Sequence, residues 1–339
     1  MSNAEKLINK EFMLKYLKAM VLPLYPDFAD IENIKIQIHK KHAWDDFYHM
    51  VISYETVFTK KEGGEEEIPV FCSAHSSEPR ENVYKVLKFL WDSGFGEGDL
   101  SIPHPLFYSN ELNGTFYRGA EGKNLYRYIR VSDFAEIENI VPKAAAWFAK
   151  LHKVPTTEAL NFNEVNSRIR TVVPGSGHLL ERIKNDYPEH YEFFRERYEH
   201  FISAEEAFLN NTNQQWLVHG DAHPENIIRM SEDKIAVIDF TDLCLADFAR
   251  DLGSFLQQLE YMCNRKINDQ AYADKMKKLF LDTYLRERKI ELDAGLQKRI
   301  DRYYYWTAVR TAVHFLMKHD SEQDRAEFLI EKVKKEFVL

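Results

Sequence analysis

The chain has 339 residues, which is enough for two lobes that each bury a core. Its formal net charge of −9 argues against a nucleic-acid-binding protein, for which a basic face would be expected. No apolar run approaches the roughly 18 residues that a membrane span requires, and the first residues lack the apolar core of a signal peptide. Cys72, Cys244 and Cys263 are scattered without metal-ligand spacing and suit reduced thiols. We therefore expect a cytoplasmic protein with neither a membrane nor a nucleic-acid partner.

The first third of the chain predicts a lobe rich in strands. Apolar residues at helical spacing from about 4 to 20 predict a leading helix that ends before Pro23. Alternating apolar and polar residues predict strands over 34–38, 48–58, 68–75, 104–109 and 114–122. A helix begins near Pro79, which suits the first turn, and closes at Gly94. Five strands with one helix after the third are therefore expected.

Helical patterns dominate the rest of the chain. Apolar residues over 134–154 recur at helical spacing, and His152 near the end of this run is expected to be a core residue. The charged and aromatic segment 155–215 predicts further helices, with solvated charged faces. The segments RYYYWTAVRTAVHFL and AEFLIEKVKKEF predict amphipathic helices near the C-terminus. A helical lobe therefore follows the strand-rich one.

The residues best suited to catalysis lie in 216–240, WLVHGDAHPENIIRMSEDKIAVIDF. This stretch predicts strand, polar loop, strand, turn and strand. An apolar hairpin would hold Asp221, Asn226 and Asp239 at one edge of a sheet. Phosphoryl transfer needs this set: one carboxylate accepts the proton of the attacking hydroxyl, and a neutral oxygen and a second carboxylate hold magnesium beside the nucleotide phosphates.

The segment HGDAHPEN followed by IDF resembles the H-R-D-x-x-x-x-N and D-F-G motifs of protein kinases. It is more similar to the aminoglycoside phosphotransferase and choline kinase-like family, whose usual form is H-G-D-x-x-x-x-N and then I-D-[FW]. The resemblance implies an α+β, bilobal protein-kinase-like fold, with a five-stranded antiparallel N-terminal lobe carrying one helix and a mostly helical C-terminal lobe. It places a nucleotide-binding lobe with the leading helix at 1–116, a hinge at 117–122, and the catalytic loop and substrate site within 123–339.

The same resemblance implies a kinase that uses Mg²⁺ and ATP (or GTP) to phosphorylate a hydroxyl of an amino sugar, amino alcohol or sugar. Asp221 is the expected catalytic base, and Asn226 and Asp239 are the expected metal ligands. His223 stands where serine/threonine kinases carry a lysine near the transferred phosphoryl group, so it is a catalytic candidate, although a loop-packing role is equally consistent. His219 is expected to anchor the loop by hydrogen-bonding its backbone.

Two aspartates downstream continue the resemblance. Asp247 is expected to accept backbone hydrogen bonds that brace the catalytic loop. Asp251, in the sequence DLG, is expected to stand at the start of a helix.

The expected adenine-binding residues are Tyr117, Gly119 and Glu121, because the family binds adenine through backbone groups of this segment. The first hairpin departs from the kinase pattern, since KKHAWDD has no glycine to wrap phosphates. Lys40, Lys41 or His42 could instead reach the phosphates through their side chains.

The third strand also departs from the family, because Ser73 stands where a lysine should contact the nucleotide phosphates. Glu81 (or Glu78) is the expected glutamate partner on the following helix. The candidate substitutes for the lysine are Lys60, Lys61, Lys85 and Lys88. A different strand register, or weak or unusual nucleotide binding, would also explain the serine, and the alternative hypothesis is a catalytically weak kinase-like binding protein.

The acceptor is less specified by the sequence. Asp242 and Glu260 could bind an amine-bearing substrate, and Tyr304 and Trp306 could border its pocket because aromatic faces attract cationic groups. An aromatic stripe in a helix is more often part of the core. The expected partners are a nucleotide and a small-molecule acceptor, in a monomer or homodimer.

Overall fold

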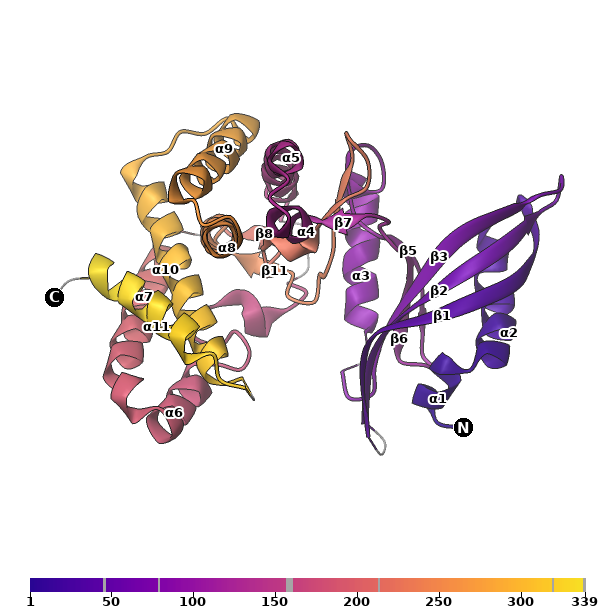
Figure 1. Ribbon diagram of the computed structural model, residues 1–339, viewed down its shortest axis with the longest axis horizontal. Coiled ribbons are helices and arrows are strands. Elements are labelled where there is room, and N and C mark those ends of the chain that lie inside the picture. The colour runs from indigo at the N-terminus through magenta and orange to yellow at the C-terminus, as the bar shows by residue number, and fades with distance from the viewer. Residues whose placement is uncertain (45–46, 79, 157–160, 213, 319, 338–339) are drawn as a thin grey trace. The chain divides into compact units, whose positions relative to one another are not determined.

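The computed structural model describes residues 1–44, 47–78, 80–156, 161–212, 214–318 and 320–337. Asp45 and Asp46 of the predicted first hairpin and Pro79 at the predicted helix start lie outside the described residues. The chain divides into two compact units, Met1–Glu121 and Gly122–Leu339 (Figure 1). No helix in the described ranges is both long and apolar enough to cross a lipid bilayer.

The first unit is built on a five-stranded antiparallel sheet in the order β1-β2-β3-β6-β5. Its strands are β1 (Phe28–Trp44), β2 (Phe47–Lys60), β3 (Glu65–His75), β5 (His104–Ser109) and β6 (Gly114–Arg118), with the short β4 (Leu100–Ser101) before β5. Its helices are α1 (Asn3–Ile8), α2 (Lys10–Met20) and α3 (Glu81–Leu90). The prediction of five strands with one helix after the third is confirmed.

The two faces of this sheet are set by the period of two along each strand. In β3, Val70, Cys72 and Ala74 belong to the core that α1 and α2 cover. Ser73 therefore points to the opposite face, where α3 packs against β5 and β6. Figure 1 shows α1 and α2 on one side of β1, β2 and β3, and α3 on the other.

The leading helix is interrupted at Asn9, contrary to the continuous helix predicted over 4–20. Asn9 has extended backbone angles and ends α1, and its side-chain oxygen accepts a hydrogen bond from the Phe12 amide at 2.8 Å. This contact is an N-cap, so the same residue stops one helix and starts the next.

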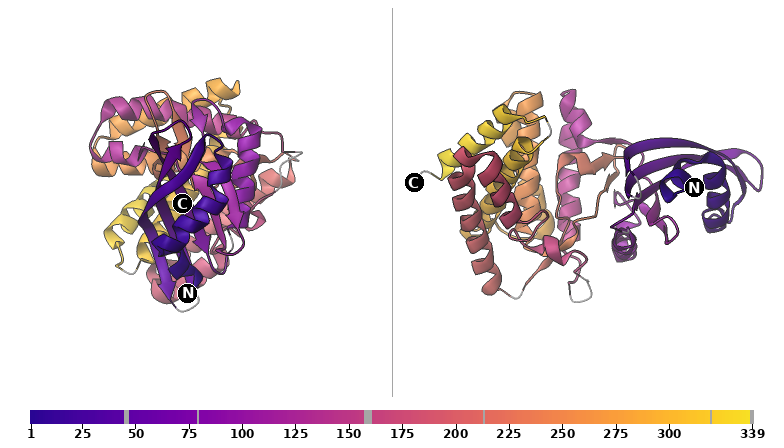
Figure 2. Two further views of the ribbon diagram at one scale, coloured as in Figure 1. Left: turned by 90° about the vertical axis from the view of Figure 1, so that its right-hand side faces the viewer. Right: turned by 90° about the horizontal axis from the view of Figure 1, so that it is seen from below.

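The second unit is mostly helical. Its helices are α4 (Leu125–Arg130), α5 (Phe134–Leu151), α6 (Ser176–Asp186), α7 (Tyr191–Asn210), α8 (Ala249–Lys266), α9 (Gln270–Arg288), α10 (Ala294–Leu316) and α11 (Gln323–Glu336). The helix α10 packs against α7, α8 and α11, and α9 packs against α5 and α8. In the right-hand view of Figure 2, these orange and yellow C-terminal helices lie together with the red α7.

Short strands carry the central segment of the second unit. The strand β8 (Trp216–Val218) pairs with β11 (Cys244–Ala246), whereas β9 (Ile227–Arg229) and β10 (Ile235–Val237) form a hairpin beside β7 (Lys123–Asn124). The predicted succession of strand, loop, strand, turn and strand is confirmed. Asn226 and Asp239 flank the β9–β10 hairpin as predicted, whereas Asp221 follows β8, which pairs with β11 in a separate sheet.

Candidate active site

The loop after β8 turns sharply at Gly220. Its φ of 83° lies in the left-handed region, and a Cβ there would stand 2.3 Å from the carbonyl oxygen of Asp242. Glycine is therefore required at this position for two reasons: the backbone angle disfavours other residues, and there is no space for a Cβ. The buried Arg250 donates a hydrogen bond to the Gly220 carbonyl at 3.1 Å, and this contact stabilises the turn.

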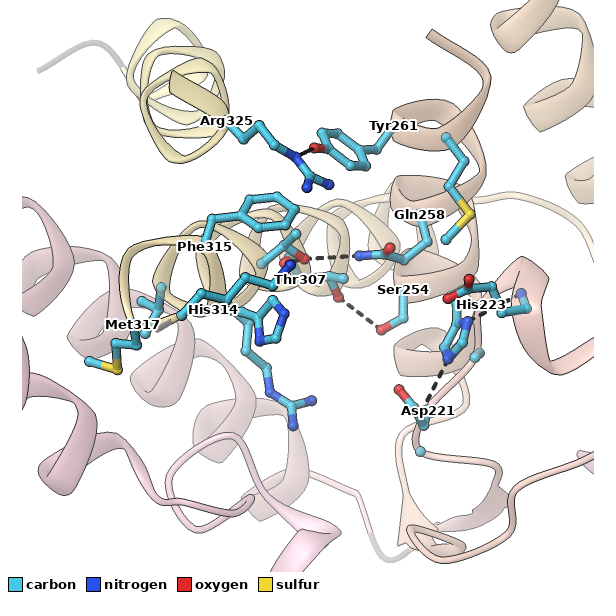
Figure 3. Close-up of a pocket in the computed structure, with 18 of the residues that line it drawn as sticks. Asp221, His223, Ser254, Gln258, Tyr261, Thr307, His314, Phe315, Met317 and Arg325 are labelled. Atoms are coloured by element: carbon cyan, nitrogen blue, oxygen red, sulfur yellow. Dashed lines mark hydrogen bonds and ion pairs between the residues drawn. The ribbon is translucent and has the colours of Figure 1, made fainter. Parts of the chain in front are cut away.

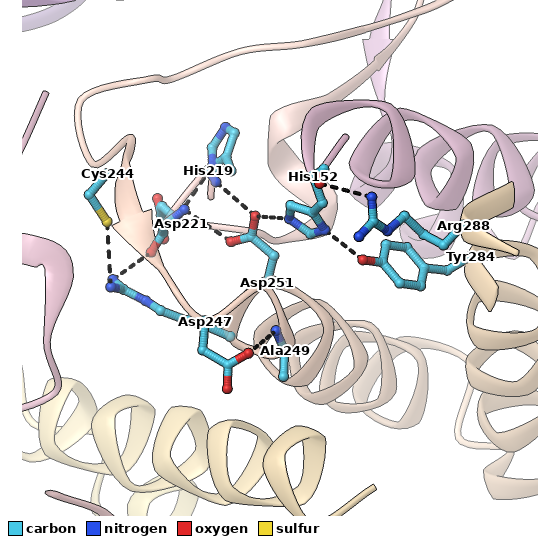
Figure 4. A network of polar contacts seen from close by, with 11 residues as sticks. His152, His219, Asp221, Cys244, Asp247, Ala249, Asp251, Tyr284 and Arg288 are labelled. Carbon is cyan, nitrogen blue, oxygen red and sulfur yellow. Dashed lines mark hydrogen bonds and ion pairs between the residues drawn. The ribbon is translucent and has the colours of Figure 1, made fainter. Parts of the chain in front are cut away.

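Asp251 braces this loop from α8 (Figure 4). Its carboxylate accepts the backbone N–H groups of His219 at 2.7 Å and Gly220 at 3.0 Å, and lies 3.1 Å from Nε2 of the buried His152. Burial would raise the pKa of Asp251, but the hydrogen bond and charge of His152 lower it, so the carboxylate is ionised near neutral pH. The prediction that His152 is a core residue is confirmed.

Asp251 stands in the first turn of α8 as predicted, but Asp247 does not have its expected role. Asp247 accepts the Ala249 N–H at 3.1 Å, where α8 begins, and pairs with Arg299 at 2.9 Å. The prediction that Asp247 braces the loop is therefore wrong, and that role belongs to Asp251. The reason is that α8 starts at Ala249, so the carboxylate of Asp251 in its first turn faces the loop, whereas Asp247, two residues before the helix, accepts the N–H of its first residue.

His219 joins the loop to the β9–β10 hairpin. Its Nε2 donates to the Ile238 carbonyl oxygen at 2.9 Å, and its Nδ1 accepts from the Asp221 amide at 3.3 Å. The side chain is fully buried and lies against the rings of Trp147 and Phe240. The prediction that His219 is a structural anchor is confirmed.

Asn226 and Asp239 are brought beside Asp221 by short-range backbone contacts. Asn226 donates through Nδ2 to the Asp221 carbonyl oxygen at 2.9 Å, and its own carbonyl accepts the Ile238 N–H at 3.0 Å. Asp239 follows with a positive φ of 66°, which is strained for a residue with a side chain. Its carboxylate is exposed and accepts a hydrogen bond from the Thr241 hydroxyl at 3.0 Å.

These two side chains fit a magnesium ion whose remaining ligands come from a nucleotide. Because the Asn226 amide nitrogen is committed to the loop, its oxygen points the other way, as a metal ligand requires. No group of three or more metal-ligating His, Cys, Asp or Glu residues occurs in the described part of the chain. Mg²⁺ is commonly held by only one or two protein oxygens together with substrate phosphates.

Asp221 pairs with His223 at 3.3 Å. Nδ1 of His223 accepts the Glu225 amide at 3.2 Å, so the imidazole proton is on Nε2, facing the carboxylate. Burial would raise the pKa of Asp221, but the hydrogen bond and charge of His223, with His219 and Arg310, hold it well below its usual range. Burial lowers the pKa of His223, and the bond to Asp221 more than reverses this. The pair therefore presents an ionised carboxylate with its side chain 44 % exposed.

Asp221 and His223 line a cavity of about 710 Å³ within the second unit (Figure 3). Its other walls come mainly from α8 and α10, including Ser254, Gln258 and Tyr261 on α8 and Thr307 and His314 on α10. A cavity of this size suits a small molecule.

The four residues predicted for the acceptor do not line this cavity. Glu260 is buried and bound by Lys277, Lys332 and the hydroxyl of Tyr304, which donates at 2.8 Å. Trp306 is buried. Asp242 accepts the Asn166 side-chain amide at 2.7 Å, and burial, followed by the charge of Asp221, raises its pKa.

The predicted nucleotide residues lie in the first unit. Ser73 is half-buried on β3, and Tyr117 lies near the end of β6 with its ring stacked on Phe71, 5.7 Å between centroids. Gly119 follows that strand, where a Cβ would stand 2.1 Å from the Phe71 ring. Glu121 is exposed.

Glu81, at the start of α3, pairs with Lys85 at 3.0 Å. Two other lysines considered as substitutes are also paired, Lys60 with Glu66 at 2.8 Å and Lys88 with Asp92 at 2.5 Å. Three of the four lysines considered as substitutes therefore already have an acidic partner, and the fourth, Lys61, is exposed in the turn between β2 and β3.

An unpredicted basic cluster, His49, His75 and Arg80, lies on the face of the sheet that Ser73 shares. His49 and His75 are cross-strand partners with ring centroids 4.8 Å apart, and Nη2 of Arg80 is 3.4 Å from Nε2 of His49. Arg80 is 8 % exposed, its Nε has no hydrogen-bond partner among the described residues, and its ion pair with the exposed Glu78 is long at 4.0 Å. Burial, then the charges of Lys40 and Arg80, lowers the pKa of His49 to about 4. The only sequence signal was that His49 and His75 fall within two consecutive predicted strands.

The sheet, the β8 loop and the hairpin define a protein-kinase-like phosphotransferase fold. The model of the phosphotransferase enzyme family matches residues 55–289, more than half of the chain, and the chain belongs to this family. No curated protein sequence matches the chain. The predicted family, its kinase-like α+β fold and its phosphotransferase class are thereby confirmed.

Several solved structures share the fold. The ethanolamine kinase of Plasmodium vivax is 14% identical with a TM-score of 0.56, over 96% of this chain and 89% of that one. A spectinomycin phosphotransferase, APH(9)-Ia, in complex with ADP and spectinomycin is 14% identical with a TM-score of 0.54, over 97% and 95%. A GDP and kanamycin complex of an APH(2")-type phosphotransferase is 15% identical with a TM-score of 0.55, over 96% and 99%. At this identity the likeness shows the fold alone.

Proposed function

We propose that the chain transfers the γ-phosphoryl group of ATP or GTP to a hydroxyl of a small molecule, with Asp221 as the base. The observation that carries this proposal is the joining of Asp221, Asn226 and Asp239 on one loop and hairpin, with Asp221 also lining a cavity of about 710 Å³. Membership of the phosphotransferase family supports the reaction type. The named neighbours, which act on or bind small hydroxylated compounds, support a small acceptor.

The reacting hydroxyl hydrogen-bonds to the carboxylate of Asp221. As its oxygen bonds to the γ-phosphorus, its proton passes to Asp221, the bond from that phosphorus to the β,γ-bridging oxygen breaks, and the nucleoside diphosphate leaves. General base catalysis of this kind contributes on the order of 10² to 10⁴ in rate. Because the transition state is loose, a strong base is unnecessary. His223, whose Nε2 proton faces Asp221, would keep that carboxylate ionised and oriented.

Magnesium, when bound, neutralises charge that develops on the phosphates. Asn226 would hold it through its side-chain oxygen and Asp239 through its carboxylate. The positive φ of Asp239 supports this role, since such strain occurs most often where function demands a side-chain position.

The first unit would bind the nucleotide. Backbone groups of Tyr117, Gly119 and Glu121 are proposed for adenine. The face that carries Ser73 would meet the phosphates. Arg80 would supply the charge that a lysine would give, because the lowered pKa values of His49 and His75 leave both imidazoles neutral near neutral pH. Glu81 forms an ion pair with Lys85, so its charge would influence the basic cluster only at longer range.

A catalytically weak binding protein is the second candidate. Ser73 on the third strand favours it, because a phosphate-binding lysine is absent at that position. The basic cluster weighs against it, since Arg80 is a buried cation with only one long ion pair.

Calorimetric titration with ATP and GTP, with and without Mg²⁺, tests the proposal on the parent protein. We expect magnesium-dependent binding that Asp239→Asn weakens at least tenfold, since a carboxylate ligand is lost. Asp221→Asn should leave nucleotide binding within about threefold of the parent while lowering turnover about 10²-fold or more. Magnesium-independent binding, or unchanged turnover in Asp221→Asn, would refute the mechanism.

A further inference from the structure

The cavity beside Asp221 is basic although the chain as a whole is acidic. The basic residues that line it are Arg265, Arg310, Lys318 and Arg325. The acidic residues that line it are Asp221 and Glu225. The chain has a formal net charge of −9, so four basic residues against two acidic ones in one small cavity are a local reversal of sign. Clefts lined by one sign of charge concentrate ligands of the other sign.

Part of this charge is already neutralised within the protein. Glu322 pairs with Lys318 at 2.6 Å and also with Arg325. Arg325 further donates to the hydroxyl of Tyr261 at 2.7 Å, and its guanidinium lies 3.7 Å from the centroid of the Phe315 ring. These contacts hold one wall of the cavity as a stack of aromatic rings and a guanidinium (Figure 3).

Within the described part of the chain, neither Arg310 nor Arg265 forms an ion pair with a carboxylate, although Asp221 and Glu225 line the same cavity. Arg310 is half-buried, makes one long hydrogen bond to the Val173 carbonyl at 3.5 Å, and lies over the Trp306 ring at 5.2 Å. A partly buried guanidinium without a carboxylate is costly unless an anion completes it.

Arg310 is also electrostatically close to the proposed base. Its charge contributes to the lowered pKa of Asp221, and burial followed by the charge of Arg250 lowers the pKa of Arg310 itself. A molecule whose hydroxyl reaches Asp221 can therefore place a second group near Arg310. Apolar side chains line the space as well, including Val173, Pro174, Leu179, Val313 and Phe315.

We infer that the acceptor is an anionic hydroxyl compound, whose carboxylate or phosphate group pairs with Arg310 while its hydroxyl meets Asp221. The inference rests on the proposed function and narrows its substrate class. An anionic acceptor replaces the amine-bearing acceptor that the sequence predicted. In this cavity an ammonium group would be repelled by guanidinium groups that form no ion pair with a carboxylate of the described residues. The two carboxylates considered for such an amine do not line the cavity, and Glu260 is already bound by two lysines.

A matched acceptor panel tests the charge preference on the full chain with saturating Mg-ATP. Glycerate and glycerol phosphate supply the two anionic groups, with glycerol and serinol as neutral and cationic partners of similar size. Hydroxymethylbenzoate, hydroxymethylbenzamide and aminomethylbenzyl alcohol repeat the comparison on a larger apolar frame. Nucleoside diphosphate release above the acceptor-free rate measures transfer, and calorimetry with each compound measures binding independently of transfer.

We expect at least tenfold tighter binding and higher kcat/KM for the anionic members of each series. The carboxylate and phosphate arms separate the two possible anions. Preference for the neutral or cationic members would overturn the inference. Binding of none of the anionic compounds, in a protein that binds Mg-ATP normally, would overturn it also, whereas absence of Mg-ATP binding would instead refute the proposed function.

Arg310→Gln tests the residue itself. For an anionic acceptor we expect KM to rise about tenfold with kcat within about threefold, because one desolvated charge pair is lost, and Arg310→Lys should recover part of this. Arg286→Gln, an exposed guanidinium of α9 that does not line the cavity, is the matched control. A raised KM for ATP with an unchanged KM for the acceptor would assign Arg310 to the nucleotide and overturn the inference. Circular dichroism of both variants checks that they fold.

Discussion

The catalytic loop of the second unit and the Ser73 face of the first unit differ in how their functional groups are supported. In the loop, each backbone turn has a dedicated buried partner: Asp251 for two amides, Arg250 for the Gly220 carbonyl, and His219 for the hairpin. On the Ser73 face, the expected lysine is absent and basic groups cluster around a buried arginine instead. The comparison teaches that the proposed site of proton transfer has its backbone fixed by buried polar side chains from α8 and from the loop itself, whereas the proposed phosphate-binding face depends on residues of β2, of β3 and of the segment after β3.

Asp251→Asn should give the largest effect. An asparagine would present an N–H₂ group to one of two backbone N–H groups, so one buried amide would lose its acceptor, and the negative charge that faces His152 would be lost. Leaving a buried amide without an acceptor costs about 1 to 3 kcal/mol of unfolding free energy, and we expect turnover to fall on the order of 10²-fold because the Asp221 loop loosens. Chemical denaturation and hydrogen exchange at His219 and Gly220 measure the two effects.

Asp247→Asn is the matched control, since this aspartate is equally buried beside the same helix start. It should also destabilise the protein, because Arg299 loses its partner. Turnover per folded molecule should stay within about threefold of the parent. Equal losses of turnover in the two variants would mean that Asp251 acts through stability alone.

Arg80→Gln tests the other side of the comparison. If the basic cluster binds phosphates, the loss of its guanidinium should weaken Mg-nucleotide binding about tenfold, which corresponds to about 1.4 kcal/mol. Arg182→Gln, an exposed guanidinium of α6, should leave binding unchanged. Calorimetric titration of both variants measures their affinity for the Mg-nucleotide. Unchanged affinity in Arg80→Gln would show that the basic cluster does not bind the nucleotide.

Sequence patterns predicted well those parts whose partners are near in the chain. Alternation identified the strands of the first sheet, and the spacing of Asp221, Asn226 and Asp239 predicted their association. The loop-bracing role of Asp251 was not predictable, because it depends on the residue at which α8 begins and therefore on which side chain of the first turn faces the loop. Helix ends are uncertain by one or two residues.

Residues whose environment comes from distant segments were missed. Arg80 follows β3, but its guanidinium meets His49 on β2, more than 30 residues earlier in the chain. Arg310 stands on α10 in an amphipathic pattern, and only the packing of α8 and α11 around it gives the cavity its charge. The aromatic stripe with Tyr304 and Trp306 was considered for a pocket, but neither residue lines this cavity.

The acid dependence of stability should report on the cluster. The folded pKa of His49, about 4, lies below its ordinary 6.5, so the unfolded chain binds the proton more readily. His49 therefore contributes stability above about pH 6.5 that is lost as the pH falls towards 4. The groups that set this environment are Lys40, His42, His75, Arg80 and, acting through His75, the acidic Glu78.

Thermal unfolding of the parent and His49→Gln across pH 4 to 7.5 measures this contribution. The Tm of the parent should fall more steeply below pH 6.5 than the Tm of the variant. The difference in Tm between parent and variant should therefore narrow or change sign as the pH is lowered. Parallel curves would show that the cationic neighbours do not act on His49.

Ser73→Lys should have the smallest effect. The new ammonium group would lie on the same face as Arg80, whose guanidinium repels added positive charge and would already serve the phosphates as a cationic partner. We expect nucleotide affinity to change by less than about threefold, since a charge added to a satisfied site gains little. A tenfold or larger gain would show that the site lacks charge, and would favour a binding protein whose kinase activity has weakened. Combining Ser73→Lys with Arg80→Gln separates the cases, because a lysine that replaces the lost guanidinium should restore binding only if the two cations serve the same phosphates.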